Sequence, residues 1–557
     1  MAVRDDRSDV KQTTTGFRDP RHHICQKQIP IRHHICQKQI PIPLLLPLTL
    51  VFVVAAITSG ALRIILLWAQ TRLGHAIGAD LSFEIYRSTL YQPYATHVSR
   101  NSSEIIAGIT DKANGVASGF IIPLMLLISS ALLLISVMAT LLSINSSVAL
   151  AAFISFGAVY AVIIFSTKKR LLLNSKRINR LVTRRIKSLQ EGLGGIRDVL
   201  LDSTQSTYTA IYREADLPLR HATASNQVIA GSPRFGIEAL GMVLIAVLAY
   251  TLILSGDEII GAIPVLGALA IGAQRMLPTL QQGYSSWSSI KGADAVLNDV
   301  LKLLEQPLPS YLNQKQPAPM QFDTEIILRD LSFRYSPNAP WVLRHLDLKI
   351  NKGARVGFIG TTGSGKSTLL DILMGLLEPS DGQLIIDNTI VDADNHRPWR
   401  ANVAHVPQTI FLADSTIAEN IAFGIPLDKV DQDRVRKAAH MAQIGETIEG
   451  WNGQYEMLVG ERGIRLSGGQ RQRIGIARAL YKKANVIVFD EATSALDNKT
   501  ELAVMDAIDN IGRETTILII AHRLTSLRGC DLIIELEYGK VIRQSTYQEM
   551  INIKQYL

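Results

Sequence analysis

Residues 355–377, RVGFIGTTGSGKSTLLDILMGLL, determine the fold class of the second half of this 557-residue chain. A short apolar run leads into a glycine-rich loop, and a helical pattern follows at once. Glycines permit the sharp turn, and backbone N–H groups of the loop and of the helix N-terminus then point at a phosphate. The residues expected to bind nucleotide phosphates are Gly360, Thr361, Thr362, Gly363, Ser364, Gly365, Lys366, Ser367 and Thr368.

Within this loop Lys366 is expected to contact the β- and γ-phosphates, and the Ser367 hydroxyl to bind Mg²⁺. A second acidic motif follows the apolar run NVIVFD at 485–490. Asp490 at the end of that expected strand is suited to the metal shell, and Glu491 to polarising an attacking water. LSGGQ, at 466–470, precedes a helical pattern and offers further backbone donors for phosphate.

Around these motifs, short β-branched runs such as VGFIG and TILIIA alternate with helical stretches. This pattern predicts an α/β domain with a largely parallel sheet. Together the motifs resemble the ATPase domain of the ATP-binding-cassette (ABC) transporters, over residues 321–557. The resemblance implies an ATPase that drives transport, with ATP and Mg²⁺ as ligands.

Further residue roles are implied by this resemblance alone. Tyr335 would stack on adenine, His522 would sense the γ-phosphate and Glu491 would be the catalytic carboxylate; a packed strand aromatic is the alternative for Tyr335 and a core histidine for His522. Two cassettes would face each other in a homodimer. One copy would close over Lys366 of the other with Ser467, Gly468, Gly469 and Gln470. Asp497 would be the acid of the loop that crosses to the second nucleotide site. The residues that would contact Mg²⁺ are Ser367, Gln408 and Asp490.

The first half has a different composition. Residues 113–167 contain no charged side chain, which suits two membrane spans of about 20 residues each. We expect five spans in a transmembrane domain over 44–305, at about 44–70, 119–142, 147–166, 235–256 and 259–280. A proline-rich linker at 306–320 then leads to the cassette at 321–557. The expected fold is therefore an all-α transmembrane domain followed by an α/β P-loop ATPase domain.

Charge sets the expected orientation. After the span at 147–166 come nine basic residues between Lys168 and Lys187 with no acid among them, so this segment is expected in the cytoplasm. This accounts for much of the net charge of +8 and argues against a nucleic-acid partner. Three cysteines exclude a small disulfide-linked scaffold. We expect a multi-pass protein of the bacterial inner membrane with a cytoplasmic ATPase domain.

Three arginines within the expected spans bear on the cargo: Arg63, Arg234 and Arg275. Each could extend to the interface, or face a cavity and bind an anionic head group through its guanidinium fork. The stretches 102–110, 232–241 and 261–285 are similar to those of bacterial flippases for lipid-linked oligosaccharides. This resemblance implies a polyprenyl-pyrophosphate-linked glycan as cargo, with membrane lipids around it. A multidrug or general lipid exporter is the alternative.

The start of the chain departs from the family pattern. Half-transporters have six spans, and the first is not recognisable here. Residues 1–43 instead form a basic tail in which RHHICQKQIPI occurs twice, at 21–31 and 32–42. Its His and Cys spacing matches no standard zinc pattern, so we expect a disordered tail. A truncated remnant that binds ATP without transport is therefore a further alternative.

Overall fold

A computed structural model describes residues 42–144, 146–254, 259–312, 314–491, 498–509, 512–521 and 523–555. The basic tail and its repeat lie outside these residues, except that Ile42 and Pro43 already belong to the first helix. The chain divides into two compact units between Ala69 and Gln70, inside that helix, and the following description concerns the unit from Gln70 onward unless stated otherwise.

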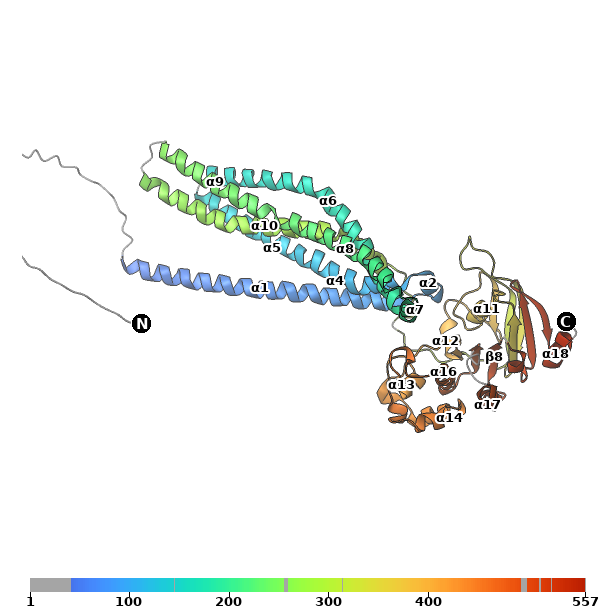
Figure 1. Ribbon diagram of the computed structural model, residues 1–557. Coiled ribbons are helices and arrows are strands. Elements are labelled where there is room, and N and C mark those ends of the chain that lie inside the picture. The colour runs from blue at the N-terminus through green and yellow to red at the C-terminus, as the bar shows by residue number, and fades with distance from the viewer. Residues whose placement is uncertain are drawn as a thin grey trace, which may run out of the picture. The chain divides into compact units, whose positions relative to one another are not determined.

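Long helices make up the described part of the first half (Figure 1). They are α1 (Ile42–Leu90), α5 (Ile122–Ile144), α6 (Ser146–Gly194), α8 (Gln205–Gly231), α9 (Pro233–Leu254) and α10 (Ile259–Leu304). Shorter helices, α2 (Tyr94–Ser99) and α7 (Ile196–Leu201), lie between them. The all-α character predicted for this half is confirmed, and the polar stretches after the spans at 44–70 and 147–166 continue the same helices.

Among the described residues, two helical segments are long and apolar enough to cross a bilayer, Leu46–Leu90 and Ser102–Ser143. These segments contain the predicted spans at about 44–70 and 119–142 almost completely. The predicted spans at 147–166, 235–256 and 259–280 lie mainly in α6, α9 and α10. That they cross a membrane stays a prediction.

The helix through residues 102–144 changes its winding twice. The α3 segment (Ser102–Ala107) passes into a π-helical segment, η1 (Gly108–Lys112); α4 (Ala113–Val116) passes into a second, η2 (Ala117–Ile121), before α5 begins. Lys112, 4% exposed, ends the first π segment, and its Nζ lies 2.8 Å from Asp299 Oδ2 of α10. Asn179 of α6 donates to the same oxygen at 2.8 Å. This partly buried ion pair and its hydrogen bond therefore connect three helical segments, η1, α6 and α10.

Apolar packing holds α10 against α5 and α6, and α6 against α8. One buried cluster includes Ile85, Val116 and Val300, and another includes Phe156, Tyr160, Ile237 and Tyr284. In the second cluster the tyrosine hydroxyls are satisfied by neighbours, since Tyr160 donates to Gln281 Oε1 at 3.2 Å. Aromatic side chains thus fill the space between α6, α9 and α10 without leaving these hydroxyls unpaired.

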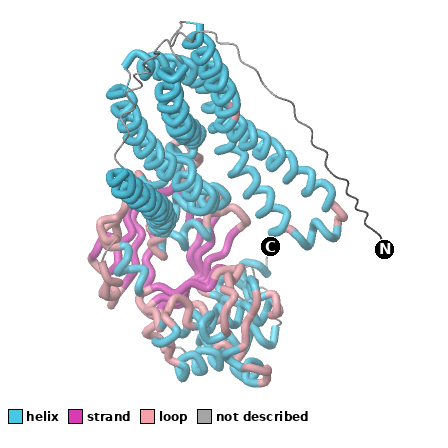
Figure 2. The backbone as a smooth tube through the Cα atoms, turned by 90° about the vertical axis from the view of Figure 1, so that its left-hand side faces the viewer, coloured by secondary structure: helices cyan, strands magenta, loops and turns pink. Residues whose placement is uncertain are grey.

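Strands begin with the second half of the chain and are drawn in magenta in Figure 2. One antiparallel sheet has the order β2 (Leu343–Asn351), β1 (Glu325–Phe333), β4 (Asp381–Ile386), β5 (Thr389–Ile390). The other has the order β10 (Lys540–Ser545), β9 (Leu532–Glu537), β3 (Arg355–Gly360), β8 (Thr516–Ile520), β7 (Val486–Asp490), β6 (Val403–Val406). All its pairs are parallel except β10 with β9, so the largely parallel sheet predicted for this domain is confirmed.

The helices of this domain include α11 (Lys366–Leu373), α12 (His396–Ala401), α13 (Ile417–Ile421), α14 (Gln432–Met441), α15 (Gly445–Glu449), α16 (Gly468–Lys482), α17 (Asn498–Asp509) and α18 (Tyr547–Gln555). Strand β3 is buried along its length, because it lies inside the sheet with apolar clusters on both faces. The loop between β3 and α11 therefore emerges at the carboxyl edge of the parallel strands, where ligands of open α/β sheets bind.

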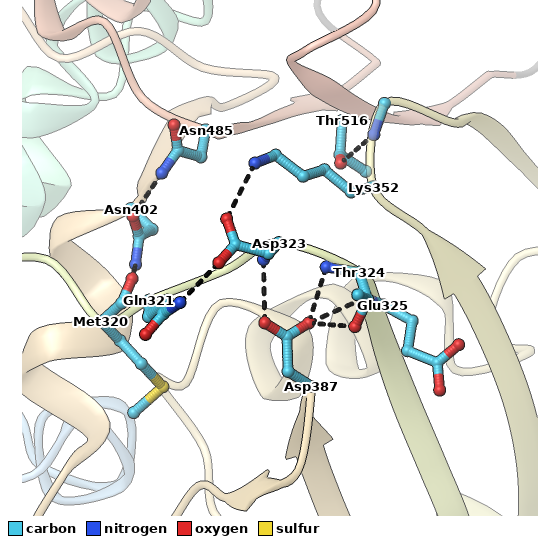
Figure 3. Close-up of polar contacts among 11 residues, drawn as sticks. Met320, Gln321, Asp323, Thr324, Glu325, Lys352, Asp387, Asn402, Asn485 and Thr516 are labelled. Atoms are coloured by element: carbon cyan, nitrogen blue, oxygen red, sulfur yellow. Dashed lines mark hydrogen bonds and ion pairs between the residues drawn. The ribbon is translucent and has the colours of Figure 1, made fainter.

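One carboxylate ties the start of this domain to the β4–β5 turn (Figure 3). Asp387 Oδ1 accepts the backbone N–H groups of Thr324 and Glu325 and the Thr324 hydroxyl, at 2.7–2.9 Å. Its Oδ2 accepts the N–H of Asp323 at 2.8 Å. Burial alone would raise the pKa of Asp387, but these hydrogen bonds outweigh it and lower the pKa to about 2.

Candidate functional site

The glycine-rich loop requires glycine at defined positions. Gly365 precedes α11 with φ +100°, and a Cβ there would lie 2.7 Å from Leu343 Cδ2. At Gly360 a Cβ would lie 2.1 Å from the carbonyl oxygen of Leu536. Gly363 also has a positive φ of +83°, but a Cβ there meets open space. The loop is thus closely packed on its protein side and open around Gly363, which suits the close approach of a phosphate.

Lys366 lies within the turn of this loop. Its Nζ donates to the carbonyl oxygens of Gly360 and Thr361, both at 2.9 Å, and the residue is only 8% exposed. Burial lowers the pKa of Lys366, while the charges of Glu491 and Asp490 act in the opposite direction. The loop that the sequence predicted for phosphate binding therefore holds an ammonium close to two acidic residues.

The two acids lie at the carboxyl end of strand β7. Asp490 ends the strand, and Glu491 has a left-handed backbone with φ +50°. Its backbone N–H donates to Ile520 O at 3.1 Å, and Gln408 Nε2 donates to Glu491 Oε2 at 2.7 Å. An uncommon backbone conformation held by neighbours on both sides is typical of functional positions. The predicted residues Gln408 and Glu491 are therefore brought into direct contact.

Oxygen donors suitable for Mg²⁺ converge on the same edge of the sheet. They are the exposed Ser367 in the first turn of α11, the carboxylate of Asp490 and the side chain of Gln408. Hydroxyl, carboxylate and amide oxygens are the ligands that this hard cation prefers. The donor set therefore fits the metal that the sequence analysis expected.

Sequence reasoning missed Asp371 of α11. Burial, together with the charge of Asp490, raises the pKa of Asp371 to about 6. Asp371 follows Ser367 by four residues, so the sequence could have placed it on the same helix face as this expected Mg²⁺ ligand. The contribution of Asp490 depends on how β7 lies beside α11, which the sequence does not reveal.

Tyr335 lies two residues after the end of β1 and is 50% exposed. Its ring packs edge-on against Phe333 at 5.0 Å, and its hydroxyl lies 3.2 Å from Thr368 Oγ1. The residue is thus half-exposed, and its hydroxyl contacts the helix that follows the phosphate loop. This placement is compatible with the adenine-stacking role, which stays a prediction.

The LSGGQ motif forms the start of helix α16. Ser467 is its N-cap and accepts the N–H of Gln470 at 3.2 Å, while Gln470 Oε1 accepts the N–H of Ser467 at 2.8 Å. This capping box leaves Gly468 and Gly469 in the first helical turn. A cavity of about 470 Å³ is lined by residues that include Gln408 and Gly468, so the two predicted motifs border one space.

Several predicted residues lie outside the described part of the structure. Asp497 and His522 are among them, and for Arg275 the backbone belongs to α10 but the side chain is not described. Arg63 lies on α1 within the first compact unit. The trio of arginines predicted for the cargo is therefore not assembled by the contacts of the described residues.

Arg234 differs from its prediction in one respect. It lies in the first turn of α9, and its Nε is 2.8 Å from Oε1 of Glu238, one turn further along the helix. Sequence reasoning treated this arginine as available for an anionic head group and overlooked the carboxylate four residues later. A pair of this spacing forms readily on a helix face and was foreseeable from the sequence.

Two protein-family models match separate parts of the chain. Residues 34–271 match the model for the "ABC transporter transmembrane region", and residues 343–494 match the model for "ABC transporter". Among solved structures, a bacterial Atm1-family ABC exporter with ATP bound is similar in fold, with a TM-score of 0.76 and 22% identity. That match covers 87% of this chain and 84% of the other.

Three curated relatives are similar over half of the chain or more. The ATP-dependent lipid A-core flippase of Alkalilimnicola ehrlichii is 27% identical over 91% of this chain and 85% of the relative. The flippase of the same name from Chromohalobacter salexigens is 34% identical over 51% of this chain and 48% of the relative. ATP-binding cassette sub-family B member 5 of Mus musculus is 37% identical over 52% of this chain. The chain spans about half the length of the Chromohalobacter relative and about a quarter of the length of the mouse relative.

Proposed function

Because the chain belongs to the ABC transporters and carries both their transmembrane region and their ATPase domain, we propose that it is a lipid exporter that flips an anionic glycolipid. The cargo class we propose is a polyprenyl-pyrophosphate-linked oligosaccharide or a similar glycolipid, moved from the cytoplasmic to the outer leaflet. The working unit would be a homodimer in a bacterial inner membrane, with Ser467–Gln470 of one copy closing over Lys366 of the other.

The observation that best supports an active ATPase is the contact between Gln408 and Glu491. The 2.7 Å bond orients the carboxylate of Glu491, the group that would accept a proton from an attacking water. Lys366 would leave the carbonyls of Gly360 and Thr361 to contact the phosphates. Bound Mg²⁺, held by Ser367, Gln408 and Asp490, would neutralise phosphate oxygens as negative charge develops.

Support for an anionic lipid cargo comes from two sources. Two relatives are named as lipid A-core flippases, which favours a lipid among the possible cargoes. Arg234 lines a cavity between the helices and carries a guanidinium, a group that binds phosphate through paired hydrogen bonds. The pairing of Arg234 with Glu238 favours the second candidate, an exporter of apolar compounds, because the pair presents no net charge to the cavity.

ATP-dependent flipping of a fluorescent lipid-linked oligosaccharide in proteoliposomes tests the proposal, with Glu491→Gln as the inactive control. We expect flipping by the wild type and none by the control. Alanine at Arg63, Arg234 or Arg275 should abolish flipping while ATP hydrolysis continues. In an exporter of apolar compounds, these substitutions should leave transport unchanged. If the wild type hydrolyses ATP but does not flip the glycolipid, the proposed cargo is wrong.

A further inference from the structure

We propose that the cavity between α6, α9 and α10 binds the anionic head of an amphiphile, and that Glu238 competes with this head for Arg234. The cavity has a volume of about 460 Å³, within the range of small-ligand sites. The inference rests on the proposed function and deepens it, because it assigns a binding site and a selectivity residue for the same cargo.

The lining of the cavity is amphipathic. Tyr160, Phe235, Leu277 and Pro278 provide apolar surface for a lipid chain. Charged and polar groups, among them Arg234, Glu238 and Gln281, line the same space. An amphiphile with an acidic head matches this combination, whereas a uniformly apolar or a uniformly polar ligand matches only part of it.

The wall around Gln281 is fixed by hydrogen bonds. Gln281 Nε2 donates to Ala230 O at 2.8 Å, and its Oε1 accepts from the Tyr160 hydroxyl at 3.2 Å. These bonds link α6, α8 and α10 around the cavity. Arg234 and Glu238 are by contrast 62% and 44% exposed, so these two side chains can change conformation when a ligand enters.

The ion pair makes the cavity selective. The bond to Glu238 uses Arg234 Nε, and an entering phosphate has to draw the guanidinium away from Glu238 or share it. A head with one negative charge gains little from this exchange, whereas a pyrophosphate carries more charge and more acceptor oxygens. Glu238 therefore discriminates against the singly charged phospholipids that surround the protein, by adding a cost that only a multiply charged head offsets.

The cavity lies at a depth suited to a lipid head. Tyr160 precedes Lys168, the first residue of the basic segment, by eight residues of the same helix. At 1.5 Å per residue this separation is about 12 Å, less than the ~15 Å of hydrocarbon in one leaflet. The basic segment marks the expected cytoplasmic side, so the cavity would receive cargo from the cytoplasmic leaflet.

Equilibrium binding of farnesyl pyrophosphate to the purified full-length protein in detergent, without nucleotide, tests the assignment. Glu238→Gln should tighten binding about two- to fivefold, since exposed ion pairs contribute up to about that factor. Arg234→Gln should weaken it about tenfold or more, as expected for losing charge-assisted hydrogen bonds. Glu238→Gln should increase the affinity for farnesyl monophosphate by a larger factor than the affinity for farnesyl pyrophosphate. The preference of the protein for the pyrophosphate should therefore become smaller in this variant.

The matched control is Glu191→Gln, which removes another i,i+4 pair, Lys187 with Glu191 at 3.6 Å on α6, from a position outside the lining of the cavity. This variant should bind farnesyl pyrophosphate like the wild type. Variants are compared only if they elute as the wild type does and retain ATP hydrolysis. If Arg234→Gln misfolds, Glu238→Gln decides the question. This variant is expected to bind farnesyl pyrophosphate more tightly, and misfolding would not increase affinity.

Farnesol and inorganic pyrophosphate separate the two halves of the ligand. If farnesol binds as tightly as farnesyl pyrophosphate, or if Glu238→Gln binds the latter no better than wild type, the assignment is wrong. The assignment is also wrong if inorganic pyrophosphate binds as tightly as farnesyl pyrophosphate, because the apolar wall would then contribute nothing to the affinity. If farnesyl pyrophosphate binds in an Arg234-dependent way but the glycolipid is not flipped, only the proposed function is wrong. If the glycolipid is flipped without such binding, only the assignment of this cavity as the binding site is wrong.

Discussion

Replacing Asp387 by asparagine tests how the ATPase domain is held at its first strand. Asparagine keeps one oxygen for the three donors at Oδ1 but places an NH₂ group against the N–H of Asp323, where the carboxylate accepts at 2.8 Å. One hydrogen bond and the negative charge are lost. Because Asp387 has φ +51°, asparagine is also a residue that tolerates this left-handed backbone.

Two routes give a similar magnitude for the loss of stability caused by Asp387→Asn. The pKa of Asp387 falls from 3.8 to about 2, a difference of ~2.4 kcal/mol at full value. The side chain is partly exposed, so we discount this by about half for solvent screening. Losing one hydrogen bond costs about 0.5–1.5 kcal/mol, and somewhat more for a charged acceptor. We therefore expect a loss of about 1–2 kcal/mol, or ~3–6 °C in the melting temperature of a domain of this size.

The assay is thermal melting of the full-length protein, followed by intrinsic fluorescence. Asp387→Gly should melt below Asp387→Asn because all four bonds are lost, and Asp387→Ala lower still because alanine is strained at positive φ. Asp394→Asn, an exposed carboxylate in the next turn, serves as the control.

Dependence on pH gives a second check. The folded pKa lies below the unfolded value, so the contribution is fully present above about pH 4 and is lost as pH falls toward 2. The difference between wild type and Asp387→Asn should be constant from pH 8 to 5 and shrink below 4. Equal melting temperatures at pH 7, or a difference that grows in acid, would refute the reasoning.

Further predictions concern the nucleotide site. Glu491→Gln should lower the ATPase turnover about 10²–10³-fold with nucleotide binding retained, measured by phosphate release and by equilibrium binding; turnover within tenfold of wild type would exclude it as general base. Gly365→Ala should abolish nucleotide binding because its Cβ would meet Leu343, whereas Gly363→Ala should reduce it only severalfold; equal effects would contradict the packing described. Ser467→Ala should cost about 1 kcal/mol through loss of the cap of α16, seen in melting, and Ser467→Asp should restore most of it.

The phosphate loop and the strand-end acids were predictable from the sequence because each is a local motif. A strand, a glycine-rich loop and a helix occupy one continuous stretch, and the structure shows them in that order at Gly360 and Lys366. The alternation of β-branched runs and helices likewise predicted the parallel sheet. The contact between Gln408 and Glu491 joins residues 83 positions apart, which only the pairing of β6 with β7 reveals.

The membrane half was less predictable in its details. The apolar stretches could be located from the sequence, because their length and composition are all that the prediction of a membrane span requires. The π-helical segments ending at Lys112 and Ile121 have no comparable signal, because their winding depends on partners such as Asp299 on another helix. The pairing of Arg234 with Glu238 was foreseeable from the sequence, because residues four apart on a helix lie on the same face.

The bonds from Lys366 to the carbonyls of Gly360 and Thr361 have a consequence for the rate of nucleotide capture. The ammonium cross-links the loop from inside, so the loop has its shape before a nucleotide arrives. Capture is then an exchange of one set of acceptors for another, without a slow ordering step. Association should proceed at ~10⁵–10⁷ M⁻¹ s⁻¹, as for a ready-made site, and nucleotides of different affinity should differ mainly in how long they stay bound.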